Sequence, residues 1–525
     1  MQNLVLVSIV VLAHAALAVD YVRPINQDCL SVPSRDVSLF PEEFMVSGEV
    51  SPMDSYTEVA SAEGFTVDYY NSYKIVTNKI ANETYVLYQC GTSPPAADAI
   101  PEGAKVFQIP LTSISAPETV PYTFLEILGL DDRVNDVSSF VTSACGQKIL
   151  GCGREGPDAM ALDNTTMLDE TVGPSVDGLL TSAAYSYPKS FAFSAAQDPG
   201  VLNRVEWIKF LGTFFNLDKY ASSVYDTIVE EYNQVKAAAA EAGEGEDTKP
   251  VVAWASHFLF DTEEAYQLSF APYKEELTTD AGAALLDFEA LLNIPGVRTS
   301  AFSNTTLEFA WDGAEAGSFA TKEEAKAAFI EALSTVDAVI DETYTPDSTT
   351  YNLAAFLEEY DITESELESM PWFTNELIFR QDGLISETNG VDWFEGAFVR
   401  PDKTLSDVLR IVTAAREAPE DATPLSQEYT WLRQIEEAPR VVNSDECQRL
   451  DSCTEEPTPI CPFVAVCGDG SSVLLTSGTS EDNAQCSYAA CPLVDSQTNT
   501  AQMAAPAVIV LTVLIVFVEA LINFC

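Results

Sequence analysis

Residues 201–242 have the sequence VLNRVEWIKFLGTFFNLDKYASSVYDTIVEEYNQVKAAAAEA, and this stretch decides the fold. It predicts two successive helices, over residues 201–215 and 219–242. In the second helix, apolar residues recur at helical spacing, namely Val224, Ile228, Tyr232 and Val235. The small, acidic and Gly-containing residues 237–249 then predict a surface loop.

Strand-like and helix-like stretches alternate on both sides of these helices. The strand-like stretches are 104–115, 176–182, 251–256 and 336–341, and the helix-like stretches are 121–130 and 322–333. Such alternation predicts an α/β protein with mainly parallel sheets. We therefore expect two lobes, residues 19–200 and 243–418, joined by the helices of 201–242.

Both ends of the chain are apolar. Residues 1–18 have an apolar core followed by small residues, which predicts a secretory signal peptide cleaved after Ala18. Residues 504–525 are long enough to span a bilayer, yet no Lys or Arg follows them. Small polar residues precede this tail, as in a glycolipid-anchor signal. A glycolipid anchor and a retained transmembrane helix both remain open, and either predicts a protein anchored at the cell surface by its C-terminus.

Cysteines and glycosylation motifs also indicate export. Ten cysteines lie outside the tail: Cys29, Cys90, Cys145, Cys152, Cys447, Cys453, Cys461, Cys467, Cys486 and Cys491. An even number in an exported chain predicts disulfides. The potential glycosylation sites are Asn82, Asn164 and Asn304, each in an Asn-X-Thr motif.

The spacing of the cysteines predicts local pairing. We expect Cys145 to pair with Cys152 across a Gly-rich stretch, and Cys29 to pair with Cys90. The last six cysteines fall within residues 440–495, which are too short to bury much core. We expect these six to pair among themselves in a small disulfide module.

Charge and motif content exclude several classes of function. The net charge is −55, from 26 basic and 81 acidic residues, whereas binding to a phosphate backbone needs clustered Lys and Arg. Nucleic acid is therefore not an expected partner. The hydrophobic content of 47% supports folded cores rather than an acidic disordered chain. The chain has no G-x-S-x-G, no H-E-x-x-H and no P-loop, so we expect a protein that is not an enzyme and needs no cofactor.

Several stretches carry a resemblance to a known family. They are FTVDYYNSYKIVTNKIANETYVLYQCGTSPP (65–95), VFQIPLTSISAPETVPYTFLEILGLDDRVNDV (106–137), RVEWIKFLGTFFN (204–216), YKEELTTDAG (273–282), IDETY (340–344) and DWFEGAFVRPDKTLSDVLRI (392–411). In their order and spacing they resemble the class III periplasmic binding proteins, which capture iron–siderophores and cobalamin. The resemblance covers residues 28–415 and is greatest to secreted eukaryotic forms similar to the ferrichrome-binding proteins of diatoms.

This resemblance implies two Rossmann-like lobes joined by a long linking helix, with the ligand in the cleft between them. Ligand contacts would come from loops that follow the strands of each lobe. The candidates are Glu118, Thr119, Tyr122, Tyr185 and Tyr187 in the first lobe and Ser256, His257, Phe258, Glu342, Tyr344 and Arg380 in the second. Packing is the alternative role for each aromatic residue, and a local hydrogen bond is the alternative for His257. Arg380 would supply charge for an anionic ligand.

The histidine content limits which classes of ligand are expected. His257 is the only histidine after the predicted signal peptide, so a site built from several imidazoles for a bare metal ion is not expected. A ferric siderophore or similar metal chelate fits better, since its own donors satisfy the metal, and an uptake receptor or reductase would be a further partner. Cobalamin binding, or a structural or adhesion role at the cell surface, remains the alternative.

Overall fold

The computed structural model describes residues 57–70, 73–90, 93–157, 161–245, 248–260, 263–311, 317–416 and 429–450, together with the backbone of four short strands. These strands are β18 (Val464–Val466), β19 (Ser472–Leu474), β20 (Thr476–Gly478) and β21 (Gln485–Ser487). The predicted signal peptide and the apolar tail lie outside the described residues, so both stay predictions. Among the described helices, none is both long enough and apolar enough to cross a membrane.

Two four-stranded sheets build the N-terminal lobe. The first has the order β1-β2-β3-β4, with β1 (Phe65–Tyr69), β2 (Tyr73–Asn78), β3 (Glu83–Gln89) and β4 (Lys105–Ile109). The second has the order β6-β5-β7-β8, with β5 (Ile114–Ala116), β6 (Val134–Val137), β7 (Gly178–Thr181) and β8 (Ser190–Ala192), and is parallel throughout. The stretch 104–115, predicted as one strand, is thus two strands in two sheets. Pro110, which has no N–H for a ladder, lies between them.

Four helices belong to this lobe: α1 (Val120–Ile127), α2 (Ala144–Gly151), α3 (Thr165–Thr171) and α4 (Val201–Phe214). Most of α4 is buried, including Trp207 and Phe210, which pack on each other and on Phe65 of β1. A helix that is apolar on most sides is expected in a core. This explains why the beginning of the 201–242 stretch forms part of the N-terminal lobe rather than a bridge.

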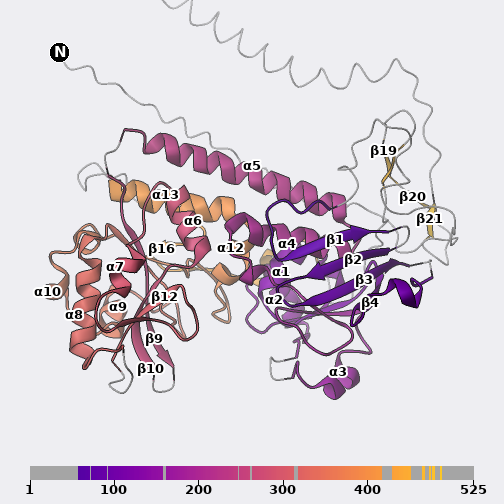
Figure 1. Ribbon diagram of the computed structural model, residues 1–525, viewed down its shortest axis with the longest axis horizontal. Helices are drawn as coiled ribbons and strands as arrows, with labels where there is room; N and C mark the ends of the chain where they lie inside the picture. The colour runs from indigo at the N-terminus through magenta and orange to yellow at the C-terminus, as the bar shows by residue number, and fades with distance from the viewer. Residues whose placement is uncertain are drawn as a thin grey trace, which may run out of the picture.

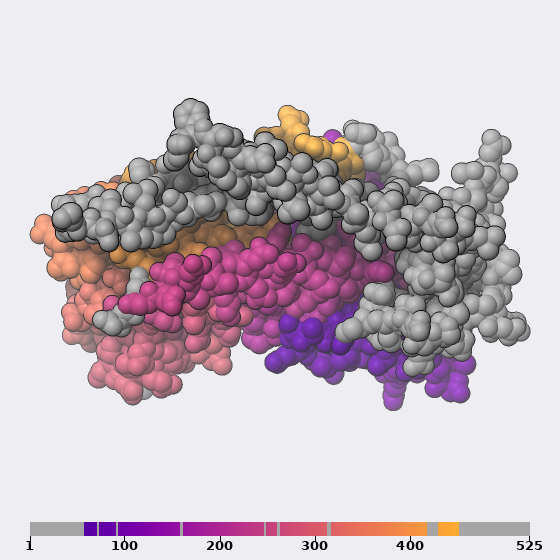
Figure 2. All heavy atoms as spheres, turned by 90° about the horizontal axis from the view of Figure 1, so that it is seen from above, coloured from indigo at the N-terminus to yellow at the C-terminus, as the bar shows by residue number. Residues whose placement is uncertain are grey.

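The bridge itself is α5 (Asp218–Ala242), which has 25 residues and is therefore about 37 Å long. It packs against α4 of the first lobe and against α6 (Pro272–Asp280) and α13 (Pro401–Arg416) of the second. Figure 1 shows α5 lying across both lobes on one side of the molecule, and Figure 2 shows it from above, beside α13. The predicted loop therefore begins only after residue 242.

A mixed seven-stranded sheet forms the C-terminal lobe, in the order β11-β12-β10-β9-β13-β14-β16. Its strands are β9 (Val252–Phe260), β10 (Glu263–Ser269), β11 (Val297–Thr299), β12 (Thr306–Ala310), β13 (Ala338–Asp341), β14 (Ile378–Arg380) and β16 (Arg433–Gln434). Within this sheet only β9, β13 and β14 pair in parallel, so the expectation of mainly parallel sheets is wrong for it. The antiparallel pairing begins where β9 returns directly as β10, without a crossover helix.

Helices cover both faces of this sheet. They are α7 (Phe288–Leu292), α8 (Lys322–Ala332), α9 (Leu353–Glu359), α10 (Glu364–Leu367) and α11 (Pro371–Thr374), in addition to α6 and α13. The short helix α12 (Gly396–Val399) lies instead against α1 and α4 of the N-terminal lobe and against α13. Successive residues of β9 enter different clusters: Ala253 and Ala255 join one core, whereas Val252 and Trp254 join the other. A strand buried on both faces explains why residues 251–256 are a continuous apolar run.

The C-terminal lobe continues beyond residue 418. β16 pairs with β14, and β17 (Arg440–Val442) pairs with β15 (Leu384–Ser386). After β17, residues 443–450, which we call the strap, return to the N-terminal lobe and reach α2 and α1. The beginning of the predicted cysteine module is therefore part of the two-lobed body.

Candidate ligand-binding site

In each lobe, the parallel strands place the loops that follow them at one edge of the sheet. In the first lobe these are the loops after β5, β6 and β7, and in the second the loops after β9, β13 and β14. Crevices outside the carboxyl ends of parallel strands are the usual ligand sites of such sheets. Figure 1 shows that the end of β9 and the start of β10 lie on the side of the molecule away from α5.

The loop after β6 is the part of this edge that reaches the other lobe. Thr388 Oγ1 donates a hydrogen bond to the Ser139 carbonyl oxygen at 3.1 Å. A Cβ at position 390 would collide with the Phe140 carbonyl oxygen, so the close approach of the lobes requires Gly390. Phe140 thus stands where the lobes meet, and it is 64% exposed. Sequence reasoning missed Phe140 because no strand was predicted at residues 134–137, and only the structure shows that Phe140 follows β6 by three positions.

Tyr344, which follows β13, faces solvent from the second lobe and is 85% exposed. Two residues farther on, the Pro346 carbonyl oxygen accepts a hydrogen bond of 3.2 Å from Asn389 Nδ2. The loop 386–390 is therefore bonded both beside Phe140 and beside Tyr344. We call these two exposed aromatic residues and the loop between them the mouth.

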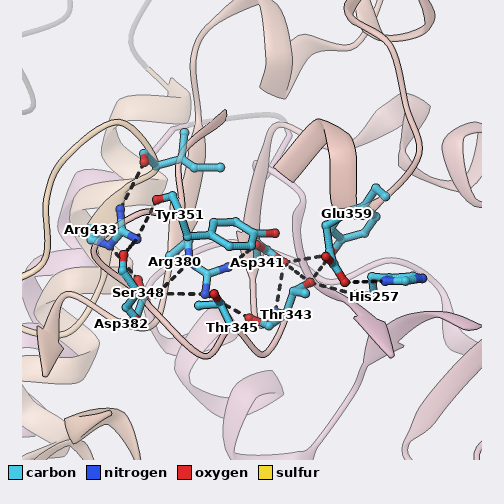
Figure 3. Close-up of polar contacts among 12 residues, drawn as sticks. His257, Asp341, Thr343, Thr345, Ser348, Tyr351, Glu359, Arg380, Asp382 and Arg433 are labelled. Carbon is cyan, nitrogen blue, oxygen red and sulfur yellow. Dashed lines mark hydrogen bonds and ion pairs between the residues drawn. The ribbon is translucent and has the colours of Figure 1, made fainter. Parts of the chain in front are cut away.

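A buried polar network holds the backbone that leads to Tyr344. Thr343 Oγ1 donates to Asp341 Oδ1 at 2.6 Å, and Tyr360 Oη donates to the same oxygen at 2.9 Å. Arg380 Nη2 donates to the Thr343 carbonyl oxygen at 3.0 Å. Figure 3 shows Asp341, Thr343 and Arg380 of this network close together, with His257 and Glu359 to one side. A satisfied network of this kind fixes the backbone geometry on which an exposed contact residue depends.

The side chain of Arg380 is engaged within this network. Its guanidinium is ion-paired with Asp341 and Asp382, lies 3.7 Å from the ring centre of Tyr351, and is 2% exposed. Arg433 completes the group, with Nε 2.7 Å from Asp382 Oδ1. The expected role of Arg380 as a donor to an anionic ligand does not fit this burial, and the residue is instead a positioning residue.

His257 makes two local contacts. Its Nδ1 lies 2.9 Å from Glu359 Oε1 and its Nε2 lies 3.1 Å from Glu264 Oε1, while its backbone N–H donates to Thr343 Oγ1 at 2.9 Å. Both ring nitrogens are therefore engaged within the lobe. The structure favours the local hydrogen-bonding role of His257 over ligand contact.

The other C-terminal candidates lie at the same edge with partners of their own. Ser256 Oγ is 3.3 Å from Gln267 Oε1, and the Phe258 ring centre is 6.0 Å from that of Phe302. Glu342 accepts a hydrogen bond of 2.6 Å from Lys274, and burial raises the pKa of the Glu342 carboxyl. None of these three has an inter-lobe contact among the described residues that would place it at the mouth.

The N-terminal candidates separate into buried and partly exposed residues. Tyr122 and Tyr187 are buried in hydrophobic clusters, so no ligand reaches them in this structure. Glu118, whose carboxyl pKa is raised by burial, accepts a hydrogen bond from the Ser182 N–H, and Thr119 directly precedes α1.

Tyr185 lines a separate open hollow of about 810 Å³ with Asn82 and Lys105. It follows β7, which lies two strands from β6, or about 10 Å farther from the C-terminal lobe. Tyr185 is therefore not part of the mouth.

The described residues contain one group with metal-ligand spacing, formed by Glu126, Asp131 and Cys145. Cys145 is in a disulfide, so its sulfur is not a thiolate ligand, and Arg449 lies 3.4 Å from Asp131. Two carboxylates beside a guanidinium do not make a cation site.

The lobes are joined at α2. Glu395 of the C-terminal lobe accepts hydrogen bonds from the N–H groups of Thr142 (2.9 Å) and Ser143 (3.4 Å), and Asp392 accepts from the Thr142 hydroxyl. On the strap side, Cys145 of α2 forms a disulfide with Cys447. We call this set of contacts the clasp. It holds the two lobes in place around the mouth.

This disulfide corrects two predictions, the pairing of Cys145 with Cys152 and the pairing of the last six cysteines among themselves. Cys145 is at the beginning of α2 and Cys152 is its C-cap, so the helix separates their Cα atoms by about 10 Å, too far for a disulfide. Cys90 and Cys152 each take part in a disulfide as well. The pairing of Cys90 with Cys29 stays a prediction because Cys29 lies outside the described residues.

No family model and no curated protein matches the chain. Among solved structures, a possible iron-binding periplasmic solute-binding protein of Staphylococcus epidermidis matches with 12% identity over 58% of this chain and 99% of its own, at a TM-score of 0.36. A periplasmic heme-binding protein of Pseudomonas aeruginosa matches with 11% identity over 63% and 100%, at 0.35. A Streptococcus pneumoniae protein in complex with ferrichrome matches with 12% identity over 58% and 94%, at 0.35. These are binding proteins of the kind that the sequence resembles, and at such scores they do not decide the ligand of this chain.

Proposed function

We propose that the protein is an extracellular solute-binding protein that holds a ferric siderophore or a similar small metal chelate at the mouth between its lobes. The observation that carries this proposal is the pair Phe140 and Tyr344. Both are large, exposed aromatic side chains, one from each lobe, on loops held to one another through residues 386–390. Exposed aromatic side chains that the backbone holds close together are typical of recognition sites, and aromatic side chains commonly line small-molecule sites.

A chelate suits this site better than a bare metal ion. Holding a bare ion needs several ligand atoms aimed at one point, and among the described residues the one candidate group is blocked by the Cys145 disulfide. The single histidine of the expected mature chain is bonded to Glu359 and Glu264. A chelate brings its own donors and presents an organic shell, which aromatic faces contact well.

One observation favours a second candidate function, a structural or adhesion role. The clasp fills part of the space between the lobes with direct contacts, such as those of Glu395 with Thr142 and Ser143. A fold that no longer needs ligand would tolerate such filling. The two candidates differ in whether any solute stabilises the protein.

Calorimetric titration of the purified secreted protein tests the proposal. The probes are ferrichrome, ferrioxamine B, cobalamin and free Fe³⁺. We expect a chelate to bind and the free ion not to, and a ligand at 100 times its dissociation constant to add about 2.7 kcal/mol of stability. If cobalamin is the only probe that binds tightly, the ligand in the proposed function is cobalamin rather than a siderophore. Absence of heat and of stabilisation with every probe would reject the proposal in favour of the structural role.

Variants locate the site. Replacing Phe140 and Tyr344 together with Ala should weaken chelate binding by more than about tenfold, since each ring loses an apolar contact of roughly 1 kcal/mol. Folding should be unaffected because both side chains are exposed. Tyr70→Ala is the matched control, because Tyr70 is also an exposed aromatic residue but lies at the end of β1, stacked on Tyr73.

A further inference from the structure

We infer that the mouth selects chelates by charge, accepting uncharged or cationic complexes and rejecting anionic ones. This inference rests on the proposed function and adds the chemical class of the ligand. A ferric ion bound by three hydroxamates is neutral, because three single negative charges balance Fe³⁺. A ferric ion bound by three catecholates carries three negative charges. The two classes have similar size, so the charge of the site separates them.

The cations behind the mouth already have anionic partners. Arg380, which donates to the carbonyl oxygen of Thr343 next to Tyr344, is ion-paired with both Asp341 and Asp382. Recruiting it to a ligand would leave the buried carboxylate of Asp341 without its ion-pair partner, which is strongly unfavourable, and would leave Asp382 paired with Arg433 alone.

The other cations of the same edge are also engaged. Lys274 lies 2.6 Å from Glu342, and Lys322 lies 2.9 Å from Glu264. On the N-terminal side, Arg154, whose carbonyl oxygen accepts from the Val137 N–H at the end of β6, has an interaction partner of its own. These cations therefore already interact with groups of the protein itself in the absence of ligand.

Acidic groups are more accessible than basic ones around the mouth. Glu387 is exposed in the loop 386–390 itself, and Glu359 is partly exposed beside His257. The net charge of −55 adds repulsion at longer range, which salt screens beyond about 8 Å.

The test is a calorimetric titration of the full secreted protein with three ferric complexes at low and at high NaCl. The complexes are a neutral trihydroxamate (ferrichrome), a cationic one (ferrioxamine B) and a trianionic tris-catecholate. We expect the first two to bind within tenfold of each other and the third to bind about 30-fold more weakly or not at all, with the difference shrinking at high salt. Glu387→Gln should narrow the difference by raising the affinity for the trianionic complex relative to the neutral one.

The outcomes separate the two proposals. Equal or tighter binding of the trianionic complex overturns the charge inference and leaves the proposed function standing. A preference for the neutral complex that does not change with salt or with Glu387→Gln also overturns it, since shape rather than charge would then decide. Failure of all three complexes to bind overturns the proposed function, and the inference falls with it.

Discussion

Removing the clasp disulfide, by replacing Cys145 and Cys447 with Ala, perturbs the connection between the lobes. Cys145 lies on α2 of the N-terminal lobe, whereas Cys447 follows β17, which is paired into the C-terminal lobe. The two side chains are 2% and 8% exposed, so the bond is buried at the junction. The variant should still fold, because α5 and the contacts of Glu395 with α2 remain.

The size of the effect follows from the loop that the bond closes. The sequence separation is 302 residues, for which the chain-entropy relation gives about 5–6 kcal/mol. Measured values for native disulfides are usually smaller, about 2–4 kcal/mol, because the unfolded chain retains structure. We therefore expect the free energy of unfolding to fall by roughly 3–5 kcal/mol.

Denaturant unfolding and scanning calorimetry of the oxidised protein and the variant measure this loss. The matched control is Glu446→Gln on the same strap, which removes the solvent-exposed ion pair of Glu446 with Arg440 of β17. The control should change stability by less than about 1 kcal/mol. A loss below about 1 kcal/mol in the disulfide variant would refute the idea that the clasp joins the lobes, as would mass mapping that connects Cys145 to another cysteine.

Three further predictions concern the network, pH and glycosylation. Arg380→Met should destabilise the protein by roughly 3–5 kcal/mol in denaturant unfolding, because the buried Asp341 loses its ion-pair partner and Asp382 keeps only Arg433, and a change below about 1 kcal/mol would show that the network is not needed. Burial raises the pKa of Glu126 to about 7 and that of Asp131 to about 6, so the folded state binds these protons more tightly than the unfolded state does. The melting temperature should therefore fall as pH rises from 5 to 8, and Glu126→Gln should make this dependence on pH weaker. A melting temperature that rises over this range would contradict the assignment. Mass spectrometry after glycosidase treatment should find glycans at the exposed positions Asn82, Asn164 and Asn304, and their absence at all three would contradict export through a glycosylating pathway.

Local patterns predicted the elements that local physics controls. The helices over 201–215 and 219–242 match α4 and α5 to within a residue or so, because periodic apolar residues specify helix and buried face together. The strand predicted over 251–256 begins β9, whose two buried faces explain its unbroken apolar sequence. An unbroken run of the same kind led to a wrong prediction at 104–115, a predicted single strand that contains β4 and β5 of two different sheets.

Long-range partners were beyond the sequence. Whether Arg380 faces a ligand or a carboxylate depends on Asp341, 39 positions away, and on the fold that brings them together. The partner of Cys145 is 302 positions away, and the helix that separates it from Cys152 was not predicted. Phe140 lies beside the other lobe only because Gly390 of that lobe lets the two loops approach. The residues at the mouth were thus identified only in part, through Tyr344.

Anomalous diffraction tests the central claim most directly, that a metal chelate is held between the lobes. Crystals of the protein grown with ferrichrome, measured at the iron absorption edge, give the position of the metal without reference to any model of the ligand. We predict one strong peak at the mouth, between the rings of Phe140 and Tyr344. A peak in the hollow beside Tyr185 and Lys105, or no peak from crystals soaked to saturation, would contradict the account.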